Sequence, residues 1–146
     1  MTTALSGKEI ANKLEKQFVR SIVESSENSF VVKSEFLLRI ATFLKTTSGL
    51  DFDYLTSITA VDYYDYFEVV YHLTSLKHNH SLVLKTRCYG RDKPRLWSVV
   101  GLWQGADFQE REIYDLMGIS FDGHPNLKRI FLWEGFQGHP LRKDYL

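Results

Sequence analysis

The chain has 146 residues, a length that suits one domain with one hydrophobic core. Its apolar and charged fractions of 44% and 25% argue against disorder, and its formal net charge of zero argues against a free nucleic-acid binder, which normally carries a basic excess. A single cysteine, Cys88, excludes an internal disulfide and a CxxC site for zinc or an iron–sulfur cluster.

The N-terminal segment predicts a helix followed by two short strands. Ser6 with Glu9 three residues later forms a capping-box pattern, and apolar residues follow at helical spacing. The stretches "VRSIVES" and "SFVVK" predict the two strands. The segment has no apolar core of the kind found in signal peptides, so we expect no signal peptide. We therefore expect the protein on the cytosolic or stromal side.

The next segment predicts a second helix and then an antiparallel meander. Ser34 is placed to cap the helix and Gly49 to end it. From residue 54 to residue 89 the apolar period changes to two, which predicts three strands in "YLTSITAVDYY", "YFEVVYHLTSL" and "HSLVLKTRCYG". Cys88 lies in the third strand, where a buried structural thiol is favoured over a nucleophile.

Charge is unevenly distributed along this predicted sheet. No Lys or Arg occurs between residues 46 and 76, whereas the stretch from Lys77 to Arg95 carries six basic residues and one acid, Asp92. Two interpretations remain open. One is pairing of opposite charges across strands on a solvated face, and the other is a polarised docking surface.

Two more helices are predicted after the sheet. "KPRLWSVVGLW" has Pro94 where a first helical turn accepts proline, and its apolar residues have helical spacing. In the second helix, Asp107 with Glu110 repeats the capping-box geometry and Gly118 is a natural end. Arg111 and Asp115, four residues apart, are placed to pair along that helix.

The C-terminal stretch "ISFDGHPNLKRIFLWEGFQGHPLRKDYL" is apolar and aromatic but contains three of the nine glycines and two of the three prolines. It is too interrupted for a long helix, so it either wraps its own domain or lies on another protein. We therefore predict an α+β domain over residues 1–122 and an extended, partner-binding tail over residues 123–146.

Enzymatic interpretations have little support in the residues. Glu110 and Glu112 are two positions apart on a helix and point in different directions, so they do not make a paired-carboxylate site. His124 and His139 each precede a proline, without the spacing of a metal motif. A stand-alone hydrolase that uses His124 and nearby acids remains the alternative from a different class.

The stretch "DFQEREIYDLMGISFDGHPNLKRI", followed by "GHPLRKDY", resembles the C-type peripheral-arm subunit of respiratory complex I, the NADH–quinone oxidoreductase, a family that includes the J-type subunit of chloroplasts. The likeness covers roughly Leu55 to Tyr145. The family pattern is met by Glu110, Arg111, Glu112, Asp115, Leu116, Met117, His124 and Lys128.

The resemblance implies an α+β fold: a mostly antiparallel sheet with helices packed on it and an extended C-terminal tail. It implies a non-catalytic, peripheral-arm subunit of a proton-translocating complex that supports assembly and the quinone-site subunit, or the equivalent subunit of a ferredoxin-linked or hydrogenase-type complex. No cofactor or metal is expected in this chain. The partners would be the D-type quinone-site subunit and the B-type iron–sulfur subunit, which would bind quinone and carry the clusters.

The implied location is peripheral, on the cytoplasmic or stromal face, with membrane contact only through the complex and no nucleic-acid partner. The residues expected at the partner interface are Glu110, Arg111, Glu112, Asp115, His124, Pro125, Lys128, Arg129, His139, Pro140, Leu141, Arg142, Lys143, Asp144 and Tyr145.

Overall fold

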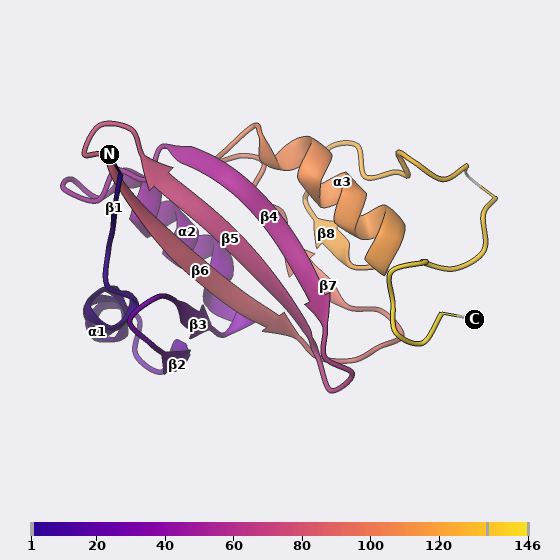
Figure 1. Ribbon diagram of the computed structural model, residues 1–146, viewed down its shortest axis with the longest axis horizontal. Helices are drawn as coiled ribbons and strands as arrows, with labels where there is room; N and C mark the ends of the chain where they lie inside the picture. Colours follow the sequence, from indigo (N-terminus) through magenta and orange to yellow (C-terminus); the bar gives the residue numbers. More distant parts are fainter. Residues whose placement is uncertain (1, 134, 146) are drawn as a thin grey trace.

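The computed structural model describes residues 2–133 and 135–145 and has an α+β fold, as predicted (Figure 1). Its elements are, in chain order, β1 (Thr3–Ala4), α1 (Gly7–Gln17), β2 (Ile22–Ser25), β3 (Phe30–Val32), the 3₁₀ turn η1 (Ser34–Phe36), α2 (Leu37–Thr46), β4 (Tyr54–Asp62), β5 (Phe67–Ser75), β6 (His80–Cys88), β7 (Arg95–Trp97), α3 (Ala106–Met117) and β8 (Ser120–Asp122).

The main sheet has the strand order β2-β3-β6-β5-β4, and β1 also pairs with β6. The predicted meander is confirmed, because β4, β5 and β6 pair antiparallel over nine-residue strands. The short strands β1 and β3 run parallel to β6 and pair with successive parts of it. Among the described strands, β4 is thus left with one paired neighbour, β5.

The core lies on one face of the meander, where α2 covers it (Figure 1). Pairs such as Tyr71 with Leu84 and Phe67 with Cys88 stack across β5 and β6 and are buried. The period-two pattern produces this because alternate side chains of a strand point to the same face. Burial raises the pKa of the Cys88 thiol to about 12, as suits a structural cysteine.

The opposite face of β5 and β6 carries paired charges. Glu68 accepts a hydrogen bond from Arg87 Nε at 3.2 Å and lies 3.7 Å from Lys85 Nζ. Cross-strand pairing is therefore confirmed at these positions. Glu68 is buried although the face is partly wetted, so the two cations compensate its desolvation.

The helices begin and end differently from the predictions in two places. Ser6 caps α1, accepting from the Glu9 N–H at 3.4 Å as expected. Ser34, however, lies in η1, and α2 begins at Leu37 without a side-chain cap. Gly49, with φ 92°, belongs to the turn after α2 and does not end the helix, which stops at Thr46.

The helix predicted over residues 93–103 was wrong. Arg95–Trp97 form β7, which pairs in parallel with β8, and turns follow it. Leu96, Val99 and Trp103 are all buried, so the apolar spacing marked core positions correctly. Pairing with a strand 25 positions further along decided the backbone, and a local pattern does not contain that information.

The termini lie at opposite ends of the molecule (Figure 1). Residues 123–133 and 135–145, the described part of the tail, form turns and bends with no helix or strand. Among the described helices, none has the length and apolar character to cross a membrane.

Candidate functional site

Helix α3 lies alongside β4, the strand at the end of the sheet order, and the tail passes around the helix (Figure 1). Gln109 on α3 accepts the outward N–H of Ile58 through Oε1 at 2.6 Å. This side chain satisfies a donor that a neighbouring strand would otherwise bind, which anchors α3 to the edge of the sheet.

Glu110 is a buried ligand of the backbone and not the predicted cap residue. The helix begins at Ala106, and Gly105 at its N-cap makes no side-chain bond. The Glu110 carboxylate accepts from Ser98 Oγ at 2.5 Å and from Val99 N–H at 2.9 Å. Burial raises its pKa, although these two bonds oppose the shift.

Asp115, on the same helix, is fully buried and binds the tail. Its Oδ1 accepts from Arg129 Nε at 2.7 Å. Its Oδ2 accepts three consecutive backbone N–H groups at 3.2, 2.8 and 3.1 Å, from Ile130, Phe131 and Leu132. Burial alone raises the pKa of Asp115, but the three amides and the guanidinium outweigh it, and the pKa lies below the usual range.

The predicted pairing of Arg111 with Asp115 was wrong. Arg111 donates from Nε to the carbonyl of Lys128 at 3.2 Å and lies over the ring of Phe108. The bond to Lys128 ties α3 to the first part of the tail, and the contact with Phe108 lies within the helix. Asp115 binds Arg129 instead of Arg111. The planar guanidinium of Arg129 makes several hydrogen bonds there, to Asp115 and to backbone carbonyls.

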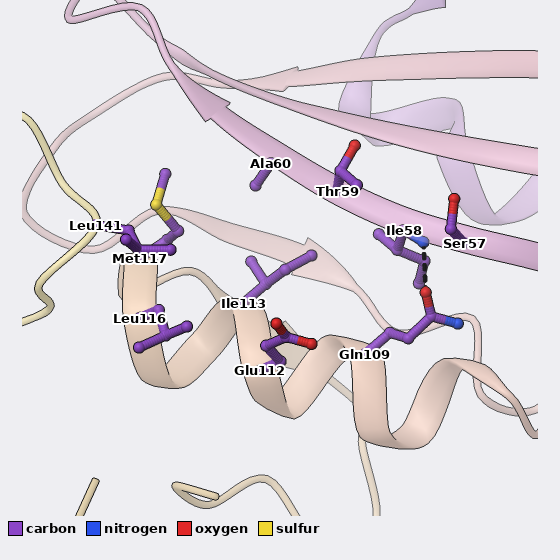
Figure 2. A pocket seen from close by; sticks show the side chains of 10 residues that line it. All are labelled: Ser57, Ile58, Thr59, Ala60, Gln109, Glu112, Ile113, Leu116, Met117 and Leu141. Carbon is purple, nitrogen blue, oxygen red and sulfur yellow. Dashed lines mark hydrogen bonds between the residues drawn. The ribbon is translucent and has the colours of Figure 1, made fainter. Parts of the chain in front are cut away.

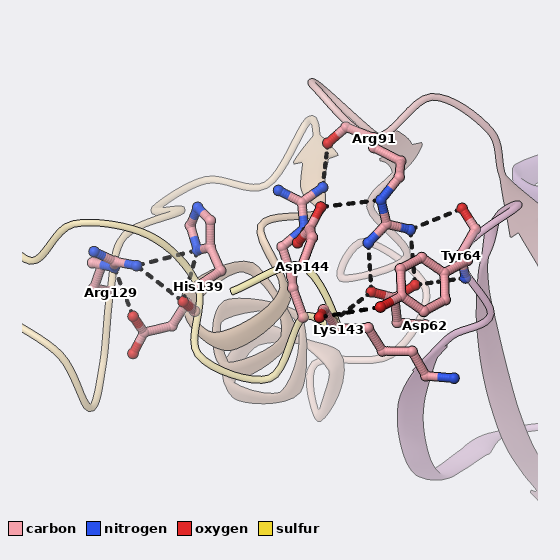
Figure 3. A network of polar contacts seen from close by, with 9 residues as sticks. Asp62, Tyr64, Arg91, Arg129, His139, Lys143 and Asp144 are labelled. Carbon is pink, nitrogen blue, oxygen red and sulfur yellow. Dashed lines mark hydrogen bonds and ion pairs between the residues drawn. The ribbon is translucent and has the colours of Figure 1, made fainter. Parts of the chain in front are cut away.

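Arg129 extends this contact along the tail. Its guanidinium donates to the carbonyl of Asp115 at 3.1 Å and to the carbonyls of Phe136 and Gly138. His139 lies beside it, with Nδ1 2.9 Å from the Asp115 carbonyl (Figure 3). Its ring also lies against Gly118, where an added Cβ would come within 2.7 Å. We call Asp115 and Arg129 the first clamp.

A second clamp holds the end of the tail on the sheet (Figure 3). Asp62, at the end of β4, binds Arg91 through both oxygens at 2.8 and 2.6 Å and accepts the N–H of Lys143 at 2.9 Å. Arg91 also donates to Asp144 at 3.1 Å, and Arg142 donates to the Arg91 carbonyl. The Arg91 guanidinium holds the pKa of Asp62 well below its usual range.

His124 is enclosed by its own chain. Its side chain is buried, and Nδ1 accepts the N–H of Asn126 at 3.0 Å. Nε2 therefore carries the hydrogen, and it lies 3.1 Å from the Asp107 carbonyl and 3.0 Å from the Asp107 carboxylate. Both ring nitrogens are occupied, so this geometry does not support His124 as a solvent-exposed general base.

A groove of about 390 Å³ runs between β4 and α3 (Figure 2). The aliphatic side chains of Ile113, Leu116 and Met117 line it, and Leu141 of the tail adds to its wall. Its polar groups are the hydroxyls of Ser57 and Thr59, the Gln109 amide already bound to Ile58, and the carboxylate of Glu112. Among the described lining residues there is no histidine, lysine, arginine or cysteine beside that carboxylate.

The predicted interface residues fall into two groups, apart from Pro140, which is half-buried. One group binds other parts of this chain and consists of Glu110, Arg111, Asp115, Arg129, Arg142 and the rings of His124 and His139. The exposed members are Glu112, Pro125, Lys128, Leu141, Lys143, Asp144 and Tyr145. Within the described residues, no three His, Cys, Asp or Glu side chains gather as a metal site.

The predictions missed Asp62, Arg91 and Ser98 as residues that organise this region. The charge switch between residues 46–76 and 77–95 was the available signal, since it places Asp62 on one side and Arg91 on the other. Ser98 gave no signal, because it lies in the segment predicted as a helix.

Residues 30–146 match the family described as "Respiratory-chain NADH dehydrogenase, 30 Kd subunit". The chain is 43% identical over 120 residues to a C-type subunit of the NADH-quinone oxidoreductase of Rhizobium meliloti (strain 1021), a match that covers 80% of this chain and 65% of that protein. It is 40% identical over 126 residues to the mitochondrial NADH dehydrogenase [ubiquinone] iron-sulfur protein 3 of Candida albicans, a match that covers 84% of this chain and 44% of that protein.

The chain spans less than two thirds of the length of each of these relatives. Among solved structures, a chain of the membrane-bound sulfane sulfur reductase, an archaeal respiratory membrane complex, superposes with a TM-score of 0.77. That match covers 95% of this chain and 85% of the other at 24% sequence identity, so it supports the fold.

Proposed function

Since the chain belongs to the family of the 30 Kd subunit of respiratory-chain NADH dehydrogenase, we propose that it is a non-catalytic, peripheral-arm subunit of a proton-translocating NADH–quinone oxidoreductase. The names of its relatives support the choice of complex. The observation that supports the non-catalytic role is that the buried carboxylate of Asp115 on α3 is bound by Arg129 and three amides of the tail.

The exposed part of the tail and α3 is the proposed contact with the neighbouring subunits. We propose that these neighbours are the D-type quinone-site subunit and the B-type iron–sulfur subunit, which bind quinone and carry the clusters. Lys128, Leu141, Lys143 and Tyr145 are accessible for direct contact. The clamps built on Asp115 and Asp62 act indirectly, because they fix the backbone that presents those side chains.

The proposed location is peripheral, on the cytoplasmic or stromal face, with membrane contact only through the complex. A formal net charge of zero supports a role without nucleic acid. The enclosed His124 weakens the alternative of a stand-alone hydrolase, because a general base needs a nitrogen free to accept a substrate proton.

The test is purification of the complex through an affinity tag at the N-terminus of this chain, which lies at the end of the molecule away from the tail (Figure 1). We expect mass spectrometry to find the quinone-site, iron–sulfur and NADH-binding subunits together. We also expect deletion of the chain to abolish NADH–quinone turnover in membranes, and the purified chain to be inert.

Two outcomes would contradict the proposal. One is a tagged chain that is recovered outside the membrane fraction without any partner subunit, while deletion of the chain leaves NADH–quinone turnover unchanged. The other is recovery with a ferredoxin- or hydrogen-oxidising subunit and no NADH-binding subunit, which would assign the chain to a related complex.

A further inference from the structure

Residues 129–133 and 135–139 belong to a loop whose two ends are held by the first clamp. Asp115 binds the three amides that follow Arg129, at the start of the loop. Arg129 binds the carbonyls of Phe136 and Gly138, near the end of the loop. A loop fixed at its base in this way loses little conformational entropy when it binds, which favours affinity.

The clamped loop presents aromatic side chains to solvent. Phe131 is 59% and Trp133 69% exposed, and Phe108 on the neighbouring turn of α3 is 55% exposed. Phe131 packs edge-to-face on Phe108 at 6.5 Å, and Trp133 packs edge-to-face on Phe136 at 6.1 Å. We call Phe108, Phe131, Trp133 and Phe136 the aromatic face.

The backbone beneath Trp133 is also fitted to its ring. Gly135 lies so close that an added Cβ would come within 2.4 Å of Trp133 Cζ3. The indole therefore packs against the ring of Phe136 and against a residue without a side chain. Tryptophan is among the residue types that most often dominate the energy of a protein interface.

Two cations, Arg111 and Lys128, lie beside the aromatic face. Arg111 lies 5.9 Å from the centre of the Phe108 ring and donates to the backbone of Lys128. No ion pair within residues 2–133 and 135–145 involves either Arg111 or Lys128. Charge complementarity therefore calls for carboxylates on whatever covers this surface.

We propose that the aromatic face inserts into an apolar pocket rimmed by carboxylates on another polypeptide of the complex, with Trp133 as the central anchor. This rests on the proposed function. A protein partner is favoured over a lipid surface because the loop is preorganised, and because two cations are fewer than the basic clusters that hold proteins on anionic membranes.

The test measures binding of the purified chain to the remaining complex, prepared from cells in which this chain has been deleted. Trp133→Ala is expected to weaken binding about 30-fold or more, since this is the effect of removing a central aromatic anchor. Gly135→Ala, which keeps the indole but displaces it, is expected to weaken binding as well. Lys128→Glu is expected to slow association roughly 10-fold at low salt.

Leu76→Ala is the matched control, because Leu76 is 67% exposed in the turn between β5 and β6, in a different part of the chain. Its binding and that of the wild type should agree. Since Trp133 is mostly exposed, the variants should keep the wild-type melting temperature, which separates loss of the contact from loss of the fold.

Binding of Trp133→Ala within threefold of the wild type would overturn this inference while leaving the proposed function intact. Wild-type chain that does not bind the depleted complex at all would contradict the proposed function itself. Vesicles of phosphatidylglycerol and phosphatidylcholine form a separate arm. If Trp133→Ala weakens binding to these vesicles and leaves binding to the complex unchanged, the aromatic face binds a membrane and not a protein.

Discussion

Helix α3 buries one carboxylate in each half: Glu110 faces the turn after β7, and Asp115 in the last turn faces the tail. Both are fully buried, yet their pKa values move in opposite directions. Glu110 has one hydroxyl and one amide as donors, and burial dominates. Asp115 has three amides and a guanidinium, which outweigh burial.

Burial alone therefore does not decide what a carboxylate contributes to the fold. The number and the charge of its hydrogen-bond donors decide it as well. The first half of α3 joins the sheet domain through the Gln109 bond to Ile58 and tolerates the Glu110 carboxylate at some cost. Its last turn holds the tail almost wholly by polar bonds, so the attachment of the tail should respond to charge and pH more than the core does.

Loss of the Asp115 carboxylate is expected to have the largest effect. Asp115→Ala leaves Arg129 and three amides without their acceptor, and it should lower the local stability of the loop by about 3 kcal/mol. Amide hydrogen exchange should show lost protection at Ile130, Phe131 and Leu132. The global unfolding midpoint should change less, because the freed tail can hydrate.

Glu112→Ala is the control for that experiment, because Glu112 is an exposed acid on the same helix. It should leave exchange in the loop unchanged. Equal protection of the loop in Asp115→Ala and the wild type would show that the clamp does not hold the tail.

Acidification should release the tail by the same route. The folded pKa of Asp115 lies below its unfolded value of about 3.9, so the unfolded state binds more protons in this range. The contribution of Asp115 is therefore fully present above about pH 4 and is lost as pH falls through the folded pKa. Hydrogen exchange of the loop amides, corrected for the intrinsic rate at each pH, should show that the tail opens before the sheet unfolds. Loss of protection in the loop and in the sheet at the same pH would contradict this.

Glu110→Gln should have the smallest effect and the opposite sign. The amide can still accept from Val99 and donate to Ser98, while the cost of burying a charge disappears. We expect a gain on the order of 1 kcal/mol at pH 7 by chemical denaturation. The folded pKa of Glu110 is raised, so its contribution is fully present below about pH 4.3 and is lost as pH rises through the folded pKa.

The gain should therefore shrink as pH falls, because the wild-type carboxyl then becomes neutral like the amide. A stability that falls by more than about 2 kcal/mol at pH 7 would mean that the ionised form is required there, as at Asp115. Together the two variants compare two carboxylates of one helix that are both shielded from solvent and have different donors.

Local patterns predicted the parts of the fold that neighbouring residues decide. The period of two gave the β4, β5 and β6 meander, and the capping box gave the start of α1 at Ser6. The helical spacing in residues 96–103 was misleading, because three buried apolar residues in a strand and a turn can have the same spacing.

The candidate site was predictable in its location and not in its contacts. The resemblance pointed to α3 and the tail, where Glu110, Asp115 and Arg129 do lie. The predicted partners were neighbours on one helix, since spacing rules of three or four residues are all that a local sequence offers. The partners in the structure are 11 to 17 positions away, and for Asp62 the tail amide is 81 positions away.

The α+β class, the strands of the meander and the apolar positions could be predicted from the amino-acid sequence, because they follow from periodicity along short stretches. The family could be predicted as well, from a pattern long enough to be specific. The pairing of residues 95–97 with β8, and the attachment of the tail by Asp115 and Asp62, came from the three-dimensional fold. The reason is physical: a buried charge takes whichever donors the fold brings to it in space.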